Sequence, residues 1–298
     1  MTMTIASTID EVLTGLSNGA RPIAGGTDLV VGSRQGKGAL PDHLIAVDRV
    51  SELTQIDAGS EVTRIGAGVT HAVLMTDQTV VDQFTGIADA AALVGSPATR
   101  NVGTIGGNVM NGSPAMDTGA PLVVLGAVAE LRSVDTTRTI PLDELWISPG
   151  TTSAAENELC TALVVPNTAP STGSAYVRLE YRRAMEIAIV GAAAAVTLDG
   201  DSITSIRVAL TAVAPTIMSV DGLEDLVGAT TSPETLDRIA STAAEQAAPI
   251  SDLRASDRYR RQMVGVMARR AVEAAKHRAS GETISVPVNR ALGVGAQA

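Results

Sequence analysis

Two glycine-rich runs about eighty residues apart constrain this chain most: PIAGGTDL at Pro22–Leu29 and TIGGN at Thr104–Asn108. A glycine lets the backbone come close to a ligand and adopt positive φ. Successive amides in such a turn form a concavity that binds anions. Two such loops can hold one pyrophosphate from both sides. A dinucleotide cofactor is therefore the leading hypothesis.

Neither run is a common nucleotide-binding motif. The stretch that starts at Gly66 has His71 where the G-x-G-x-x-G pattern requires its last glycine, and the stretch GSRQGKG from Gly32 lacks the Walker spacing. A Rossmann site and a P-loop are thereby excluded. A plain interpretation stays open for both runs, in which each is only a tight turn between a strand and a helix.

Short polar side chains accompany the first run. The Thr27 hydroxyl is expected to meet an anion beside the amides of Gly25 and Gly26, while Asp28 points away or caps the next turn, because a carboxylate repels phosphate. The second run offers the same chemistry, with Thr104 and Asn108 flanking a glycine pair.

One carboxylate follows the second run. Asp117 lies nine residues after Asn108, and a fixed carboxylate accepts hydrogen bonds well from ribose and ribityl hydroxyls. The other interpretation makes Asp117 the N-cap of a helix led by Pro121. The two roles do not exclude each other.

Composition limits the partners and the compartment. The net charge of −10 disfavours nucleic acid and anionic membranes as main partners. Cys160 is the only cysteine, so neither an internal disulfide nor a cysteine-ligated iron–sulfur cluster is possible on this chain. No apolar run is long enough to span a membrane, and no signal peptide is visible. We expect a soluble cytoplasmic protein.

The pattern of elements predicts an α+β fold in three parts. We expect an α/β lobe at 1–55, a second lobe at 56–170, a third domain at 171–285 and a loose tail at 286–298. The clearest predicted elements are helices at Ser7–Leu16, Ile87–Val94 and Ser256–Arg278, a hairpin of Val128–Arg132 with Arg138–Pro141, and strands at Leu159–Pro166, Ala175–Arg182, Ala188–Leu198 and Ile203–Val213.

Four motifs together resemble one family, the FAD-binding (medium) subunit of molybdenum-containing hydroxylases. They are PIAGGTDLVVG from Pro22, SPATRNVGTIGGNVMNGSPAMDTGAPLVVLGA from Ser96, VALTAVAPT from Val208 and PISDLRASDRYRRQMVGVMARRAV from Pro249. The resemblance covers nearly the whole chain. It implies a two-lobed FAD domain of the vanillyl-alcohol-oxidase (PCMH) type, followed by a domain of a small antiparallel sheet and helices.

The resemblance also implies a set of cofactor-binding residues. Arg178 falls where the family usually has a lysine near the flavin, and Cys160 where a large aliphatic residue packs beside it. From the residues alone, a surface ion pair is the commoner explanation for an arginine such as Arg178, and Cys160 is interpreted as a small buried apolar side chain. The implied residues are Ile23, Ala24, Gly25, Gly26, Thr27, Asp28, Leu29, Thr104, Gly106, Gly107, Asn108, Asn111, Asp117, Cys160 and Arg178.

The function that the resemblance implies is electron transfer. Substrate is hydroxylated at a molybdenum cofactor on a large subunit, electrons cross two [2Fe–2S] clusters on a small subunit, and FAD on this chain passes them to an external acceptor. The implied assembly is a heterotrimer doubled to (αβγ)2. The alternatives are a stand-alone FAD-dependent oxidoreductase and a non-enzymatic nucleotide-binding or scaffolding module.

Overall fold

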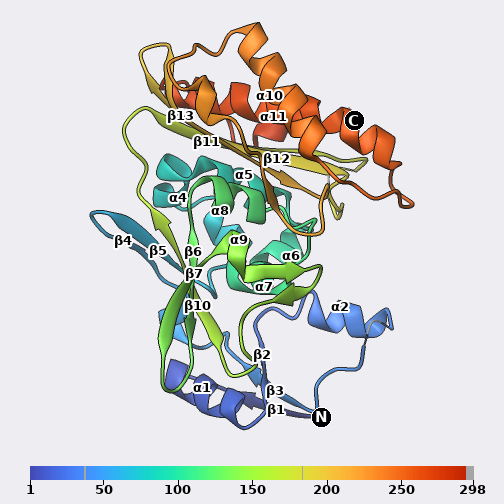
Figure 1. Ribbon diagram of the computed structural model, residues 1–298. Coiled ribbons are helices and arrows are strands. Elements are labelled where there is room, and N and C mark those ends of the chain that lie inside the picture. The colour runs from blue at the N-terminus through green and yellow to red at the C-terminus, as the bar shows by residue number, and fades with distance from the viewer. Residues whose placement is uncertain (37, 183, 293–298) are drawn as a thin grey trace.

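Three parts stack along the molecule in the order of the chain (Figure 1). The computed structural model describes residues 1–36, 38–182 and 184–292. The N-terminal lobe lies at one end, the second lobe in the middle and the C-terminal domain at the other end. Helices and sheets occur in all three, as the sequence predicts.

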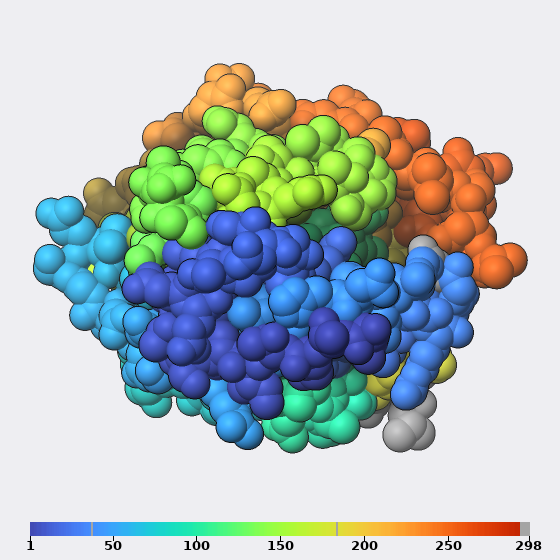
Figure 2. All heavy atoms as spheres, turned by 90° about the horizontal axis from the view of Figure 1, so that it is seen from below, coloured from blue at the N-terminus to red at the C-terminus, as the bar shows by residue number. Residues whose placement is uncertain are grey.

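The N-terminal lobe is a parallel sheet of order β1–β3–β2 with helix α1 packed against it. Thr8 caps α1 by accepting a hydrogen bond from the Glu11 amide, and Ile9, Val12 and Leu13 form its buried face. Seen from below, the lobe lies in front of the second lobe (Figure 2). Its elements are β1 Thr2–Ile5, α1 Ile9–Ser17, β2 Arg21–Ile23, α2 Leu29–Arg34, β3 His43–Ala46 and η1 Ser51–Leu53.

The second lobe is built on an antiparallel sheet of order β4–β5–β10–β6–β7. The predicted hairpin is confirmed, with Val128 opposite Pro141 and Arg132 opposite Thr137. The strands and helices of this lobe share one aliphatic core. Its elements are β4 Ile56–Ala58, β5 Val62–Gly66, α3 His71–Leu74, α4 Gln78–Gln83, α5 Thr85–Leu93, α6 Pro97–Val102, α7 Ile105–Asn111, α8 Gly119–Val124, β6 Val128–Arg132, β7 Thr137–Pro141, α9 Leu142–Leu145, β8 Trp146–Ser148, β9 Thr151–Thr152 and β10 Leu159–Pro166.

The C-terminal domain is the predicted small antiparallel sheet with helices. The long helix α11 lies across β11 and β12, so close that a Cβ on Gly173 would stand 2.2 Å from the Ala275 carbonyl oxygen. Ser232 and Ser256 cap the two long helices by accepting hydrogen bonds from the amides of Thr235 and Tyr259. The elements are β11 Thr172–Leu179, β12 Val190–Asp199, β13 Ser202–Thr211, β14 Met218–Ser219, η2 Glu224–Leu226, α10 Pro233–Gln246, α11 Asp257–Ala279 and α12 Val288–Ala291.

Both faces of strand β12 in this sheet are buried. Along β12, Ala192 and Ala194 pack toward α11, whereas Ala193 and Ala195 join the core of the second lobe. The alternation follows from the two-residue period of a strand. The sheet therefore belongs to two cores at once and holds the C-terminal domain against the second lobe.

A buried carboxylate fastens the same junction. Asp89 on α5 is fully buried and accepts hydrogen bonds from the backbone amides of Tyr176 and Val288, at 3.2 and 2.9 Å. Arg278 of α11 binds both of its oxygens, at 2.5 and 3.0 Å. Four donors from the C-terminal domain thus meet one side chain of the second lobe.

The prediction of a loose tail at 286–298 is wrong for residues 286–292. Val288 and Asn289 are buried, because Val288 joins the core of the C-terminal domain and Asn289 bonds both the amide and the carbonyl of Arg178. The rest of that prediction, 293–298, lies outside the described residues. The boundaries at 55 and 170 stay predictions, and Leu159 of β10 packs in the core of the N-terminal lobe.

Candidate functional site

The two glycine runs cross in direct backbone contact. A Cβ built on Gly25 would lie 2.0 Å from the carbonyl oxygen of Val102 and 3.0 Å from the amide nitrogen of Gly103. Only a glycine lets the first loop pass so close to the segment that precedes the second. The chain thus places at one point two runs that are far apart in sequence.

The first loop carries unpaired donors. It follows β2, turns at Gly26 with φ of 65°, and leads into α2. Among the described residues, none accepts a hydrogen bond from the amides of Gly25, Gly26 and Thr27. Asp28 occupies the N-cap position of α2, and Ile23, Ala24 and Leu29 flank the turn partly buried. Three neighbouring donors without an acceptor form the concavity expected for an anion.

The second loop differs from the expectation, because it is the first turn of a helix. Thr104 caps α7, and its hydroxyl oxygen accepts a hydrogen bond from the Gly107 amide at 3.1 Å. The amides of Ile105 and Gly106 donate to the carbonyls of Val69 and Ala67. These amides are therefore satisfied inside the protein, and the expectation of equal chemistry in the two loops is wrong.

The two glycines of α7 have separate roles in the structure. Gly106 is buried, and a Cβ there would lie 2.4 Å from the Ala67 Cβ and 2.7 Å from its carbonyl oxygen. Gly107 is exposed, and a Cβ there would meet only the Thr104 hydroxyl, at 3.0 Å. Gly106 is thus required for packing, whereas Gly107 leaves open space at the surface.

Side chains supply the donors that this loop retains. The Thr104 hydroxyl accepts from Gly107 and keeps its own hydrogen to donate. The Asn108 carbonyl oxygen accepts from the Thr118 hydroxyl at 2.6 Å, which leaves its NH2 group as a donor. Asn111 is exposed at the end of α7. The second loop offers hydroxyl and amide groups rather than backbone N–H.

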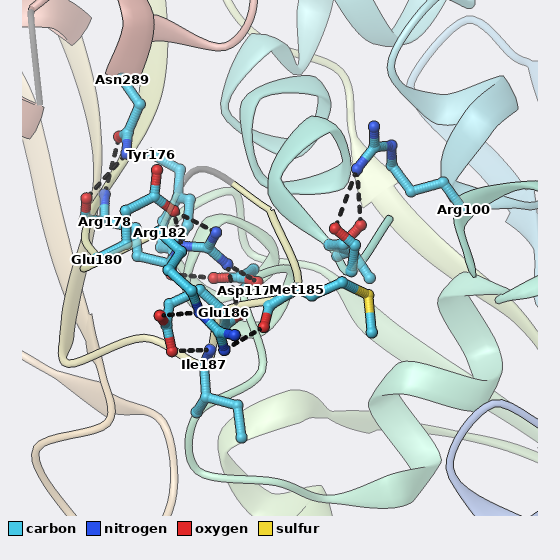
Figure 3. A network of polar contacts seen from close by, with 12 residues as sticks. Arg100, Asp117, Tyr176, Arg178, Glu180, Arg182, Met185, Glu186, Ile187 and Asn289 are labelled. Carbon is cyan, nitrogen blue, oxygen red and sulfur yellow. Dashed lines mark hydrogen bonds and ion pairs between the residues drawn. The ribbon is translucent and has the colours of Figure 1, made fainter. Parts of the chain in front are cut away.

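Asp117 lies in a buried network between the second lobe and β11 (Figure 3). One carboxylate oxygen accepts from the Tyr176 hydroxyl and the other from the Arg178 guanidinium, each at 2.8 Å. Burial raises the pKa of Asp117, against the opposing effect of Arg178 and the Tyr176 hydrogen bond. The capping interpretation is wrong, because Thr118 is the N-cap residue of α8.

Arg178 is completely buried and is no surface ion-pair residue. It bonds Asp117 on one side and Glu180 on the other, and donates to the Glu186 carbonyl oxygen at 3.3 Å (Figure 3). Burial lowers the pKa of Arg178, but Asp117, Tyr176 and Glu180 more than offset this and raise it above its ordinary value. The guanidinium is permanently charged and held in one orientation.

Cys160 lies in the core of the second lobe, next to a bulge in β10. It is 5 % exposed, and burial, with the charge of Glu130 second, raises the pKa of its thiol to about 12. The side chain is therefore a neutral apolar group. Its packing beside a flavin stays a prediction.

Three functional candidates were missed by the reasoning from sequence: His71, Tyr176 and Glu180. All are buried and all contact the predicted site residues or the loops. For His71 a signal exists, since it follows the capping residue Thr70 in a glycine-rich stretch. For Tyr176 and Glu180 the only hint is the two-residue spacing that they share with Arg178, along β11 and at the residue that follows it.

Comparison with known proteins decides the family. The sequence pattern described as "FAD binding domain in molybdopterin dehydrogenase" matches residues 1–168, and that of the "CO dehydrogenase flavoprotein C-terminal domain" matches 174–275. The chain belongs to the FAD-binding medium subunits of molybdenum hydroxylases. The matches confirm the family that the sequence motifs predicted. Membership also confirms that this subunit belongs to an oxidoreductase and that its cofactor is FAD.

Individual relatives are similar to this chain over nearly their whole length. The carbon monoxide dehydrogenase medium chain of Afipia carboxidovorans is 34 % identical over 270 residues, 90 % of this chain and 93 % of that one. The xanthine dehydrogenase FAD-binding subunit of Escherichia coli is 27 % identical over 93 % of this chain and 96 % of its own. The solved carbon monoxide dehydrogenase of Hydrogenophaga pseudoflava superposes with a TM-score of 0.89 at 31 % identity, covering 93 % and 98 % of the two chains.

The residues at the crossing fit an FAD of this family. Three unpaired amides in a glycine turn suit a pyrophosphate, and the open space above Gly107 lets a ligand approach α7. No three His, Cys, Asp or Glu side chains within 1–36, 38–182 and 184–292 gather as metal ligands. Over those same residues, no helix combines the length and apolarity that a membrane span requires.

Proposed function

We propose that this chain holds FAD at the crossing of its two glycine loops. There it accepts electrons from [2Fe–2S] clusters of a partner subunit and passes them to an external acceptor. The observation that carries the placement is the contact of Gly25 with Val102 and Gly103, which brings the free donors of both loops to one point. The single cysteine supports a separate subunit for the clusters.

Each loop contributes different groups to the proposed site. The amides of Gly25, Gly26 and Thr27 bind the pyrophosphate as a fixed anion cradle. The hydroxyl of Thr104 and the NH2 group of Asn108 donate from the other side, where Gly107 leaves room. FAD supplies the redox chemistry when bound, and these groups bind and orient it.

Asp117 completes the site through its remaining lone pairs. Each of its oxygens accepts one hydrogen bond from the protein, so each keeps a second lone pair for a ribityl or ribose hydroxyl. Tyr176 and Arg178 hold the carboxylate in place. Arg178 therefore acts on the cofactor through Asp117, and its direct contact with the flavin stays a prediction.

The same pairing supports an electron-transferring subunit rather than a stand-alone oxidoreductase. A stand-alone enzyme needs a proton acceptor at the flavin, and Asp117 and Glu180 are both engaged by Arg178. We propose a cytoplasmic complex with a small iron–sulfur subunit and a large molybdenum subunit, doubled to (αβγ)2.

Cofactor analysis of the chain, expressed with its partners and then separated, tests the proposal. We expect one FAD per chain and no iron or molybdenum, and a native mass of the intact complex that corresponds to two copies of each subunit. Iron on the separated chain, or FMN in place of FAD, would contradict the proposal.

A further inference from the structure

A buried histidine lies directly behind the crossing of the two loops. His71 is 2 % exposed, and its backbone amide donates to the Gly103 carbonyl oxygen at 3.0 Å. A Cβ built on Gly103 would stand 3.4 Å from the His71 Cδ2 atom and 3.5 Å from the Thr27 hydroxyl oxygen. The imidazole and the Thr27 hydroxyl therefore flank the same glycine.

The ring has an unsatisfied atom. Among the residues that the structure describes, none bonds the buried Nδ1 of His71. Nε2 is bonded to Cδ2, the ring atom nearest to a Cβ built on Gly103, so the Nε2 edge of the ring lies on the side of the loops, and Nδ1 is on the other edge and buried.

Burial and one neighbouring positive charge keep the His71 ring neutral in the cofactor-free protein. Burial first, and Arg100 of α6 second, lower the pKa of His71 to about 4. Helix α5, which also packs against α3, carries Asp89, but that carboxylate is bound by Arg278. The first loop carries Asp28. A neutral imidazole thus stands beside the donors that await an anion.

We propose that His71 couples FAD binding to the uptake of a proton. This rests on the proposed function, which puts the pyrophosphate at the crossing. A pyrophosphate carries two negative charges, and a nearby negative charge stabilises imidazolium. The proton comes from solvent, forms the second N–H bond of the ring, and returns to solvent when the cofactor leaves.

Linkage makes the coupling measurable from both sides. If FAD favours the protonated ring, protons favour FAD by the same factor. FAD affinity then increases as the pH falls, by up to tenfold per unit between the titration midpoints of the loaded and the free protein. The coupling can therefore be tested by measurements of FAD binding alone, without an assay of redox activity.

Calorimetry of FAD binding to the refolded or deflavinated chain at pH 5.5, in two buffers of different ionisation enthalpy, counts the protons. We expect uptake of roughly half a proton per FAD, the value for an upward shift of about 1.5 units from a midpoint of about 4. His71→Asn should take up none. His277→Asn is the matched control and should behave as the wild type, because His277 lies on α11 and pairs with Glu282 beyond the end of that helix.

Equal uptake in wild type and His71→Asn would overturn the inference, as would no uptake in the wild type. Absence of FAD binding in every protein would instead overturn the proposed function, and the inference with it. If His71→Asn fails to fold, the coupling is tested in the wild type by NMR pH titration of its three ¹⁵N-labelled histidines, with and without FAD. The His71 midpoint must then increase by at least one unit on addition of FAD, and an unchanged midpoint refutes the coupling.

Discussion

Two adjacent glycines of α7 are expected to respond in opposite ways to the same substitution. Gly106→Ala places a Cβ 2.4 Å from the Ala67 Cβ and 2.7 Å from its carbonyl oxygen, so backbone has to move. Overpacking of this kind costs about 1–3 kcal/mol. Gly107→Ala meets only the Thr104 hydroxyl, at 3.0 Å and at an exposed position.

The comparison isolates the packing cost. Replacing a helix glycine by alanine stabilises a helix by about 1 kcal/mol, and this gain cancels because both glycines lie in α7. In urea unfolding of the cofactor-free proteins, Gly106→Ala should therefore be about 1–3 kcal/mol less stable than Gly107→Ala. In fluorescence titration with FAD, Gly107→Ala should bind at least about tenfold more weakly than wild type, about 1.4 kcal/mol.

Each half of this expectation can fail separately. Equal stability of the two variants would refute the packing role of Gly106. An FAD affinity of Gly107→Ala within about twofold of wild type would show that the cofactor does not approach the start of α7, whatever the stability of the variant.

Three further predictions concern buried polar groups. Asp89→Asn should lower the free energy of unfolding by about 3–5 kcal/mol, because it leaves Arg278 without its anionic partner; a loss under about 1 kcal/mol in urea would contradict the role of this junction. Tyr176→Phe should lower it by about 1–3 kcal/mol, since it removes the hydroxyl that donates to Asp117, and calorimetric unfolding checks this. The unfolded chain binds a proton at His71 below about pH 6.5, whereas the folded cofactor-free chain binds it only near pH 4. The free energy of unfolding should therefore fall as the pH decreases through this window, by about 3 kcal/mol in total. The same loss in His71→Asn would exclude His71 as its source.

Elements with strong local signals were predictable from the sequence. Strand β10 begins and ends at the predicted residues, and α11 lies within one residue of its predicted bounds, because apolar residues recur along it at helical spacing. The hairpin of β6 and β7 was also predicted, and along β6 buried and half-buried residues alternate. In these places the local preference and the tertiary packing agree.

Helix α7 was not predictable in this way, because two adjacent glycines oppose a helix. The structure shows what overrides that preference: the Thr104 cap, and hydrogen bonds from the amides of Ile105 and Gly106 to carbonyl groups in the segment that follows β5. The burial of Asn289 depends likewise on Arg178, 111 residues away. Contacts between distant segments leave no periodic signal.

The same distinction applies to the candidate site: its local features were predictable from the sequence, and its contacts between distant segments were not. The glycine loops were recognisable because glycine is the usual residue where a backbone must come close to a ligand or to another segment. The network of Asp117, Tyr176 and Arg178 was only partly visible, since it joins two domains and is read from no single stretch. The sequence named two of its three members without showing that they touch.

The central claim is that the backbone donors of the first loop hold the pyrophosphate of FAD. Amide NMR of the ¹⁵N-labelled chain, titrated in parallel with FAD and with riboflavin, which has no phosphate, tests this most directly. We expect FAD to shift the amide resonances of Gly25, Gly26 and Thr27 strongly and riboflavin to leave them nearly unchanged. Saturating FAD that leaves these three resonances in place would contradict the claim.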